Sequence, residues 1–387
     1  MRTIYSCPRY FLSIVAILFL YALSSNAFAY RTDHGFLPPG ANVCAAHVPV
    51  TLAIPPNALP VPDPSQGEFS HGFYHVEEID DGLYYIADGV YFSMFLVSHD
   101  GIIVVDAPPS IGVNQLDPSK SINIVDVIYS IPATQGKPIK KLIYSHTHMD
   151  HIGAASIIQD AFPNVEIIAH QLTKAQLIQG DNDLEGLLPG AGSNPPPIPT
   201  KVFKKKMKVE LGKQVLRLSY KGPAHEPGNI YIYAPKQSVL MLIDVIFPGW
   251  SPFNNLALAE EVPAYLDAYD EVLAYDFDIF IAGHINRLGT RADVEEAQQY
   301  MMDIKANALS ALQNPALFQI FSILPHNALG AFSIYLDQMA CDCANRTLDP
   351  AITPSGKDWR SRMGNADNGT LTHCWAMGEA MRIDPSF

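Results

Sequence analysis

The sequence predicts an α/β protein, built as a four-layer αβ/βα sandwich. Two observations favour this fold. Strand-like runs alternate with helical patterns in two successive stretches of the chain, which is typical of layered α/β proteins. In both stretches, histidine or aspartate stands where an apolar strand-like run ends. We therefore expect two β-rich halves with polar side chains at the seam between them.

The first 29 residues predict a secretory signal peptide. Arg2 and Arg9 give a positive start, residues 11–22 form an apolar core, and Ala27-Phe28-Ala29 is a small-residue cleavage site. A core of this length is shorter than the roughly 20 apolar residues of a membrane span, although an uncleaved anchor is the alternative. We expect a secreted or periplasmic protein that starts near Tyr30 and is not stably inserted in a membrane after cleavage.

The amino-acid composition restricts the kinds of partner that the protein can bind. The formal net charge is −14, and it becomes −16 when the two arginines of the signal are removed. A strongly acidic protein is a poor candidate for binding nucleic acid or an anionic membrane. The apolar fraction of 48% supports a large hydrophobic core. We expect one large domain at 67–312, preceded by a Pro-rich arm at 30–66, and the sequence leaves the oligomeric state open.

The last segment, 313–387, reads as a helical region followed by a loop-rich, disulfide-held extension. Four cysteines remain after signal cleavage, namely Cys44, Cys341, Cys343 and Cys374. They allow three pairings, and we expect bridges that fasten the tail to itself and to the arm at Cys44. A zinc site made from Cys341 and Cys343 is the alternative.

Within the main domain, Asp-Gly turns separate the first strands, which predicts an antiparallel meander. These strands are expected at 73–79, 83–86, 91–97 and 102–106. Asp106 is expected to cap the turn after the last one, with a supporting role behind a functional site as the alternative. Helices are expected at 121–131, 152–162, 171–179, 262–274 and from about 292. Further strands are expected at 140–144, 165–169, 206–211, 215–219, 230–233, 239–244 and 278–282. The lysines between Lys201 and Lys208 are typical of an exposed edge strand, with an anion-binding patch as the alternative.

A cluster of potential metal ligands follows the strand at 140–144. Three histidines and one aspartate lie within six residues, at His146, His148, Asp150 and His151. On an extended backbone two residues that are two apart point the same way, so His146 and His148 can serve one ion. Asp150 and His151 open a helical run and can serve a second. Imidazole nitrogen with carboxylate oxygen favours zinc, and then iron or manganese.

Two divalent ions need more than four ligands, and the chain supplies three more at strand ends. His225 stands in a turn between two strand-like runs, Asp244 follows the buried run 239–243, and His284 follows the run 279–283. We therefore expect all three to meet the first cluster.

In this order and spacing, the motifs resemble those of the metallo-β-lactamase fold superfamily over about residues 72–300. The resemblance implies that His146, His148 and His225 bind one metal, and that Asp150, His151 and His284 bind the other. It also implies that Asp244 bridges both. β-Lactamases of this fold carry Cys or Ser at that position, whereas Asp resembles the lactonase, glyoxalase II and phosphodiesterase branches.

The expected activity is hydrolysis of an ester, lactone or amide bond in a small apolar molecule through a metal-bridging hydroxide. Two ions can lower the pKa of water toward about 7, and Asp150 is placed to pass its proton to the leaving group. Trp250 and Phe253 follow Asp244 closely. They are expected to wall the substrate pocket, with core packing as the alternative.

Other activities remain as alternatives. The first is a β-lactamase, which Asp244 disfavours. A mononuclear iron persulfide dioxygenase would use a set resembling His146, His225 and Asp244, but export argues against it. A phosphodiesterase or sulfatase would need a basic residue near the motifs, for which Arg287 is the candidate. A binding protein without catalysis would be expected to lack some of the seven ligands.

Overall fold

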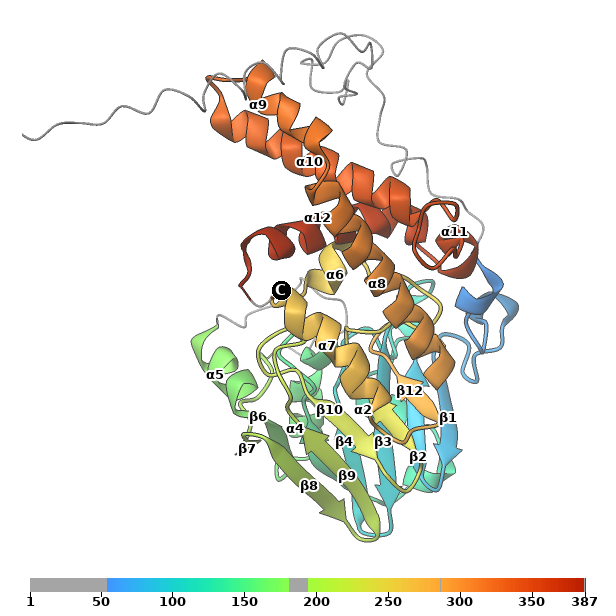
Figure 1. The fold of residues 1–387 in the computed structure, drawn as a ribbon. Coiled ribbons are helices and arrows are strands. Elements are labelled where there is room, and N and C mark those ends of the chain that lie inside the picture. The colour runs from blue at the N-terminus through green and yellow to red at the C-terminus, as the bar shows by residue number, and fades with distance from the viewer. Residues whose placement is uncertain (1–53, 181–193, 286, 386) are drawn as a thin grey trace, which may run out of the picture.

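The computed structural model describes residues 54–180, 194–285, 287–385 and 387, and two β-sheets lie face to face within it (Figure 1). The first sheet has seven strands in sequence order. They are β1 (His75–Asp80), β2 (Leu83–Ala87), β3 (Phe92–Ser98), β4 (Gly101–Val105), β5 (Ile139–Ile143), β6 (Glu166–His170) and β7 (Lys201–Phe203). The second sheet has five strands in the order β12-β11-β10-β9-β8. They are β8 (Lys206–Leu211), β9 (Gln214–Ser219), β10 (Tyr231–Ala234), β11 (Val239–Met241) and β12 (Ile279–Ile281).

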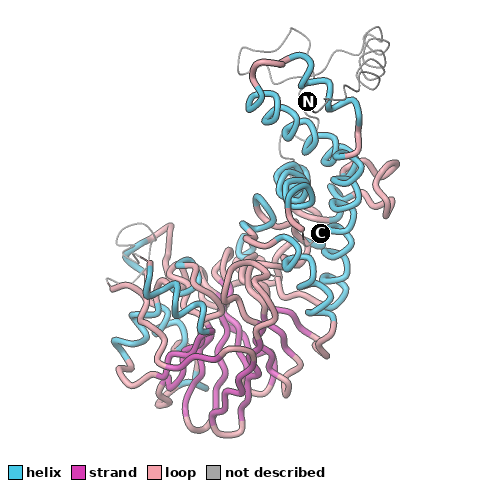
Figure 2. The backbone as a smooth tube through the Cα atoms, turned by 60° about the vertical axis from the view of Figure 1, so that its left-hand side comes forward, coloured by secondary structure: helices cyan, strands magenta, loops and turns pink. Residues whose placement is uncertain are grey.

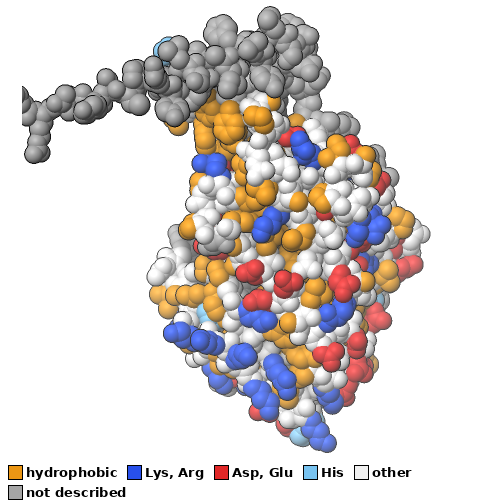
Figure 3. Space-filling model, in the orientation of Figure 1, with side chains coloured by type: hydrophobic (Ala, Val, Ile, Leu, Met, Phe, Trp, Pro, Cys, Tyr) orange, Lys and Arg blue, Asp and Glu red, His pale blue; other side chains and the backbone are white. Residues whose placement is uncertain are grey.

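Strand pairing changes direction within each sheet. Strands β1 to β4 pair antiparallel, which confirms the predicted meander, and β4 to β7 pair parallel. In the second sheet β8 to β11 are antiparallel and β11 pairs with β12 in parallel. The lysine run forms β7 and β8, one edge of each sheet, and basic side chains gather over this part of the surface (Figure 3).

Helices cover the outer faces of both sheets, as Figures 1 and 2 show. Those of the first half are α2 (Ile124–Ile128), α3 (Met149–Ile152), α4 (Ala155–Ala161) and α5 (Gln171–Gln179). Those after the second sheet's first strands are α6 (Asn254–Leu258), α7 (Val262–Leu273) and α8 (Arg291–Leu312). The last ones are α9 (Ile320–Ile323), α10 (Ala328–Thr347), α11 (Trp359–Arg362) and α12 (Ala366–Ile383).

Alternating apolar side chains along the strands create the layers. In β2, Tyr84 and Ile86 join the core under α2 and α4, whereas Leu83 and Tyr85 face the second sheet. Successive strand residues point to opposite faces, so one strand supplies two cores. A third core lies between the second sheet and α7 and α8. The predicted four-layer α/β sandwich is therefore confirmed.

The C-terminal helices are not separated from this sandwich. Their buried side chains, such as Trp359 and Met377, belong to the same hydrophobic core as Phe280 of β12. The tail was expected to be loop-rich, and that expectation is wrong, because α12 alone spans Ala366–Ile383. The boundary at 312–313 stays a prediction.

Disulfides hold the extension. Cys343 of α10 is bonded to Cys374 of α12, which confirms a bridge within the tail. Cys341 is disulfide-bonded as well, so the alternative zinc site of Cys341 and Cys343 is wrong. The predicted partner Cys44 lies outside the described residues, as do the signal peptide and most of the arm. Among the helices that the structure describes, none has the length and apolar character needed to cross a membrane.

Two expected elements have other bounds than predicted, for local reasons. The helix expected at 152–162 begins only at Ala155, as α4, because the Ala154 amide donates to the Ala107 carbonyl and separates α4 from α3. The strand expected at 239–244 stops at Met241, and Asp244 adopts a positive φ of 63°. This turn re-aims the Asp244 side chain at the seam between the sheets.

A buried histidine joins the extension to the sandwich. His373 Nε2 lies 3.1 Å from the Phe253 carbonyl oxygen, and Nδ1 lies 3.1 Å from the Tyr300 hydroxyl. Both contacts are satisfied by a neutral ring that donates from Nε2 and accepts at Nδ1, which is the tautomer we assign. Burial lowers the pKa of His373 from 6.5 to about 4.

This pKa predicts a pH-dependent stability. Below pH 6.5 His373 becomes protonated in the unfolded chain, whereas in the folded chain it stays neutral until about pH 4. The neutral His373 therefore contributes stability to the folded state above pH 6.5, and about 3 kcal/mol of this free energy is lost as the pH falls toward 4. Replacing His373 by Gln, whose amide still donates, should flatten the dependence of unfolding free energy on pH in urea titrations. The exposed His326→Gln variant should keep the wild-type slope.

Candidate metal centre

The loop after β5 carries the first ligand cluster to the edge of the first sheet. The Ser145 amide donates to Asp106 Oδ1 at 2.7 Å, and the Ser145 carbonyl accepts from the Ile230 amide at 3.0 Å. The loop is thus tied to both sheets. His146 is fully buried, and His148 stands at the N-terminus of α3, which contains Asp150 and His151. The sequence therefore folds this motif as a strand exit followed by a helix start, as predicted.

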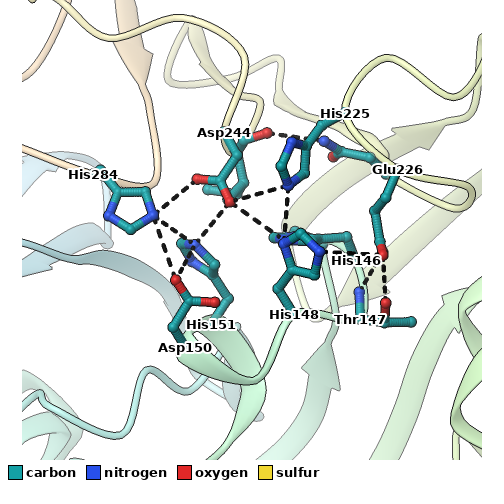
Figure 4. Close-up of polar contacts among 12 residues, drawn as sticks. His146, Thr147, His148, Asp150, His151, His225, Glu226, Asp244 and His284 are labelled. Atoms are coloured by element: carbon teal, nitrogen blue, oxygen red, sulfur yellow. Dashed lines mark hydrogen bonds and ion pairs between the residues drawn. The ribbon is translucent and has the colours of Figure 1, made fainter. Parts of the chain in front are cut away.

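The distant ligands reach the same place from the second sheet (Figure 4). His225 lies in the loop between β9 and β10, Asp244 follows β11, and His284 follows β12. The ligand atoms of His146, His148, His225 and Asp244 lie within 4.8 Å of one another. Those of Asp150, His151 and His284 form a second group within the same limit. The structure therefore brings all seven predicted residues together.

Asp244 stands between the two groups. Its Oδ2 lies 3.4 Å from His146 Nε2, 3.5 Å from His225 Nε2 and 3.1 Å from His151 Nε2. Its Oδ1 lies 3.1 Å from His284 Nε2. One carboxylate thus faces imidazoles of both groups, which is the position that a bridging ligand requires.

The donor atoms fit metal ions better than they fit one another. His146 Nε2 is buried without a hydrogen-bond partner. His151 Nε2 and His284 Nε2 face each other at 3.1 Å, as do His225 Nε2 and His148 Nδ1 at 2.9 Å. Two neutral ring nitrogens at such distances compete for one proton, whereas both lone pairs can bind a cation.

Burial sets the protonation states that metal binding needs. It lowers the pKa of His146 well below its usual value and that of His225 to about 4, so both rings are neutral at pH 7. Burial alone would raise the pKa of Asp244, but the charges of His151 and His284 hold it well below its usual range. The first group therefore offers the neutral imidazoles of His146 and His225 beside an ionised Asp244.

The two aromatic residues expected at the substrate pocket differ in their surroundings. Phe253 is 40% exposed, and its ring centroid lies 6.0 Å from that of His284, so it borders the second group. Trp250 donates from its indole nitrogen to the Ala58 carbonyl at 2.7 Å and packs on Gly364. These contacts favour the alternative role of Trp250, packing, and its place at the substrate pocket stays a prediction. Phe247, which was not singled out, has its ring 6.1 Å from His284.

Two buried acids lie behind the ligands, and of these the sequence does not predict a functional role for Glu226. Glu226 accepts from the Thr147 amide at 2.6 Å and from the Thr147 hydroxyl at 2.5 Å, and its Oε2 lies 3.7 Å from His148 Nε2. Asp106, expected as a turn cap, is fully buried under the loop, and burial raises its pKa to about 6. The signal for Glu226 was its place directly after His225.

A glycine is required beside His284. A Cβ atom at Gly283 would lie 2.5 Å from Ile243 Cγ2, 3.0 Å from Asp244 Oδ1 and 3.1 Å from His151 Cε1. Gly283→Ala should push ligands of the two groups apart and cost about 1–3 kcal/mol in overpacking. We expect metal affinity roughly 10- to 100-fold weaker in chelator competition. Unchanged affinity would mean that the two groups do not act together.

Comparison with known proteins shows to which protein family the α/β sandwich belongs. A model of the metallo-beta-lactamase superfamily matches residues 87–284, more than half of the chain. A curated relative, the 2,4-dinitroanisole O-demethylase subunit alpha of Nocardioides sp. (strain JS1661), is 27% identical over 218 residues. That match covers 56% of this chain and 58% of the relative, which is less than two thirds of its length.

Solved structures resemble the fold. A metallo-beta-lactamase from Pontibacter korlensis is 13% identical with a TM-score of 0.41, over 58% of this chain and 99% of that one. A stereoselective inverting sec-alkylsulfatase from Pseudomonas sp. is 16% identical with a TM-score of 0.52, over 81% of this chain and 50% of that one. At this identity the second likeness shows a shared fold, over a longer part of the chain than the first.

Proposed function

Because this chain belongs to the metallo-beta-lactamase superfamily, we propose that it is an exported metal-dependent hydrolase that cleaves an ester, lactone or amide bond in an uncharged small molecule. The observation that carries the proposal is the convergence of seven side chains, from both sheets, into two adjacent groups of metal ligands. Within the described residues the predicted set is complete, which favours catalysis over binding alone.

The seven residues would bind two metal ions, and zinc is the metal that suits their donor atoms best. His146, His148 and His225 would hold one, Asp150, His151 and His284 the other, and Asp244 would bind both. When bound, such ions supply Lewis acidity and make water nucleophilic at neutral pH. Of the two carboxylate ligands, Asp150 is the more exposed to solvent: its side chain is 31% exposed, and that of Asp244 is 2% exposed. It is therefore placed to accept a proton from water and deliver it to a leaving group.

The surroundings favour an uncharged, apolar substrate. Phe247 and Phe253 lie beside His284, and both are apolar. Arg287, the candidate for anion binding, is engaged by Asp293, with Nη2 2.5 Å and Nη1 3.1 Å from its carboxylate oxygens. A sulfate or phosphate ester would need a free cation, so these contacts support a neutral ester or lactone.

The curated relative favours a second candidate. Its name describes removal of the methyl group from an aromatic ether. For this chain the corresponding reaction is hydrolysis, in which water adds, the carbon–oxygen bond breaks and an alcohol leaves with a phenol. An electron-poor aryl ether is neutral and flat, and it suits the same aromatic surroundings.

A substrate panel tests the proposal. The zinc-loaded mature chain is given an aryl ester, a γ-lactone, an anilide, 2,4-dinitroanisole, an alkyl sulfate, a phosphodiester and a cephalosporin. We expect turnover of the neutral substrates and little of the charged ones, and loss of turnover in His148→Ala but not in the exposed control His326→Ala. Turnover confined to the sulfate, phosphodiester or cephalosporin, or full activity in His148→Ala, would refute it.

Export is the second part of the proposal. It rests on the charged start, apolar core and small-residue cleavage site of residues 1–29. N-terminal sequencing of the protein from its natural source should begin near Tyr30. A chain that still carries residues 1–29 would overturn the proposal of export, but it would leave the proposed hydrolase activity unaffected.

A further inference from the structure

A tyrosine that belongs to neither ligand group lies directly beside the second one. The ring centroid of Tyr91 is 4.6 Å from that of His284 and 5.6 Å from that of His151. Its ring meets His151 edge-on, with 72° between the planes. Two of the three ligands of the second group therefore pack against this one side chain.

The backbone fixes Tyr91 in this place. Tyr91 and His284 form an antiparallel β-bridge. On either side, the Phe92 amide donates to the Gly283 carbonyl and the Ile285 amide donates to the Val90 carbonyl, both at 2.9 Å. The loop before β3 and the loop after β12 are thus stitched together, so Tyr91 and His284 cannot move independently.

The turn that presents Tyr91 is itself held. Asp88 Oδ1 accepts from the amides of Val90 and Tyr91, at 2.9 and 2.8 Å. Its Oδ2 accepts from the Ser110 hydroxyl at 2.5 Å. A carboxylate that satisfies two amides of its own turn stabilises that turn in one conformation.

The third ligand of the second group, Asp150, lies near the Tyr91 phenol, because the negative charge of its carboxylate acts on that hydroxyl. Asp150 lies at the N-terminus of α3, and its described contacts are otherwise with His151 and His284, at 3.7 and 3.6 Å.

The two groups therefore differ in how they are supported. In the first group Ser145 contacts His146, and Glu226 lies behind His148, whose side chain is 36% exposed. In the second group the side chains of Asp150 and His284 are 31% and 12% exposed. Partners behind metal ligands orient them, and removing such a partner typically weakens metal binding by about 10- to 100-fold.

We propose that Tyr91 is a positioning residue whose ring packs on His284 and whose hydroxyl donates to Asp150, so that occupancy of the second metal site depends on this hydroxyl group. This inference rests on the proposed function, because it presupposes a site for two ions. It assigns to Tyr91 control over whether the protein holds one ion or two, and hence over hydrolysis that needs both.

The test compares Tyr91→Phe with Tyr84→Phe. The second variant also removes one tyrosine hydroxyl, from a residue that donates to Glu78 at 2.8 Å and whose ring stacks on Phe95 in the outer core of the first sheet. Zinc binding is measured by competition with a chromophoric chelator. In Tyr91→Phe we expect the tighter ion to bind as in wild type and the weaker ion about 10- to 100-fold less tightly. Tyr84→Phe should bind both ions like wild type.

A second variant and a kinetic measurement separate alignment from general loosening. Glu226→Gln should weaken the ion of the first group, because it disturbs Thr147 and His148. In Tyr91→Phe, kcat should fall at limiting zinc and recover with excess zinc, with KM little changed.

Two results overturn the inference. If wild type binds two ions and Tyr91→Phe binds both with wild-type affinity, the role of Tyr91 is refuted while the proposed function stands. If wild type itself binds fewer than two ions, the two-ion site fails, and the inference falls with it.

Discussion

Replacing Asp244 by asparagine should remove one of the two metal ions and lower turnover by roughly 1000-fold. Asp244 is 2% exposed, and four imidazole nitrogens from both ligand groups lie within 3.5 Å of its oxygens. Loss of one partner from a buried charged set costs about 3–5 kcal/mol. At 1.36 kcal/mol for each factor of ten, that range centres on roughly 1000-fold.

Asparagine has the shape of aspartate without its charge, so the comparison isolates the electrostatic contribution. Metal content by mass spectrometry and turnover of the best panel substrate are measured together. The Asp117→Asn variant is the control, since the half-exposed Asp117 carboxylate contacts Ser119 and Lys120 in a surface turn. If Asp244→Asn retained both ions and full turnover, the bridging role would be excluded.

Removing the metal should abolish turnover and also destabilise the fold. A ligand that binds only the folded state stabilises it by about 4 kcal/mol at 1000 times its dissociation constant. Urea unfolding with a chelator should therefore show a lower free energy of unfolding than with added zinc. Readdition of zinc should restore both stability and turnover. Equal stability in the two conditions would argue that no ion binds in the folded chain.

The same experiment has a pH signature with a defined sign. Burial lowers the pKa of His151, but the charges of Asp244, Asp150 and Asp106 outweigh it and raise that pKa to about 9. A zinc ion that binds Nε2 must displace this proton. Metal binding at pH 7 should thus release a proton, and the affinity should fall as the pH decreases. Calorimetry in two buffers of different ionisation enthalpy measures the release.

The sequence predicts the seven ligands because each one follows an apolar strand or opens a helix. Strand ends are recognisable from period-two patterns and turns, and the ends of neighbouring strands meet at one edge of a sheet. The four layers follow from the same alternation. The convergence of His225 and His284 with the loop at 146–151, which lie far apart in sequence, is the result that these local patterns anticipated best.

The residues that support the ligands were harder to predict. Asp106 and Tyr91 make their contacts singly, with residues far away in the sequence, and no local spacing marks them. For Glu226 the local signal is its place directly after His225. The packing contacts of Trp250 could not be predicted for a related reason: its neighbours Ala58 and Gly364 come from distant segments that only folding brings together. The sequence of α12 has no clear helical pattern. The helix is stabilised by packing on α8 and α10 and by the disulfide at Cys374, and a sequence pattern does not show such tertiary contacts.

The most direct test of the central claim is anomalous diffraction at the zinc absorption edge from crystals of the zinc-loaded protein. Two strong peaks should appear, one beside each ligand group, with Asp244 between them. A single peak, or peaks away from His146 and His284, would contradict a site in which these seven side chains hold two ions.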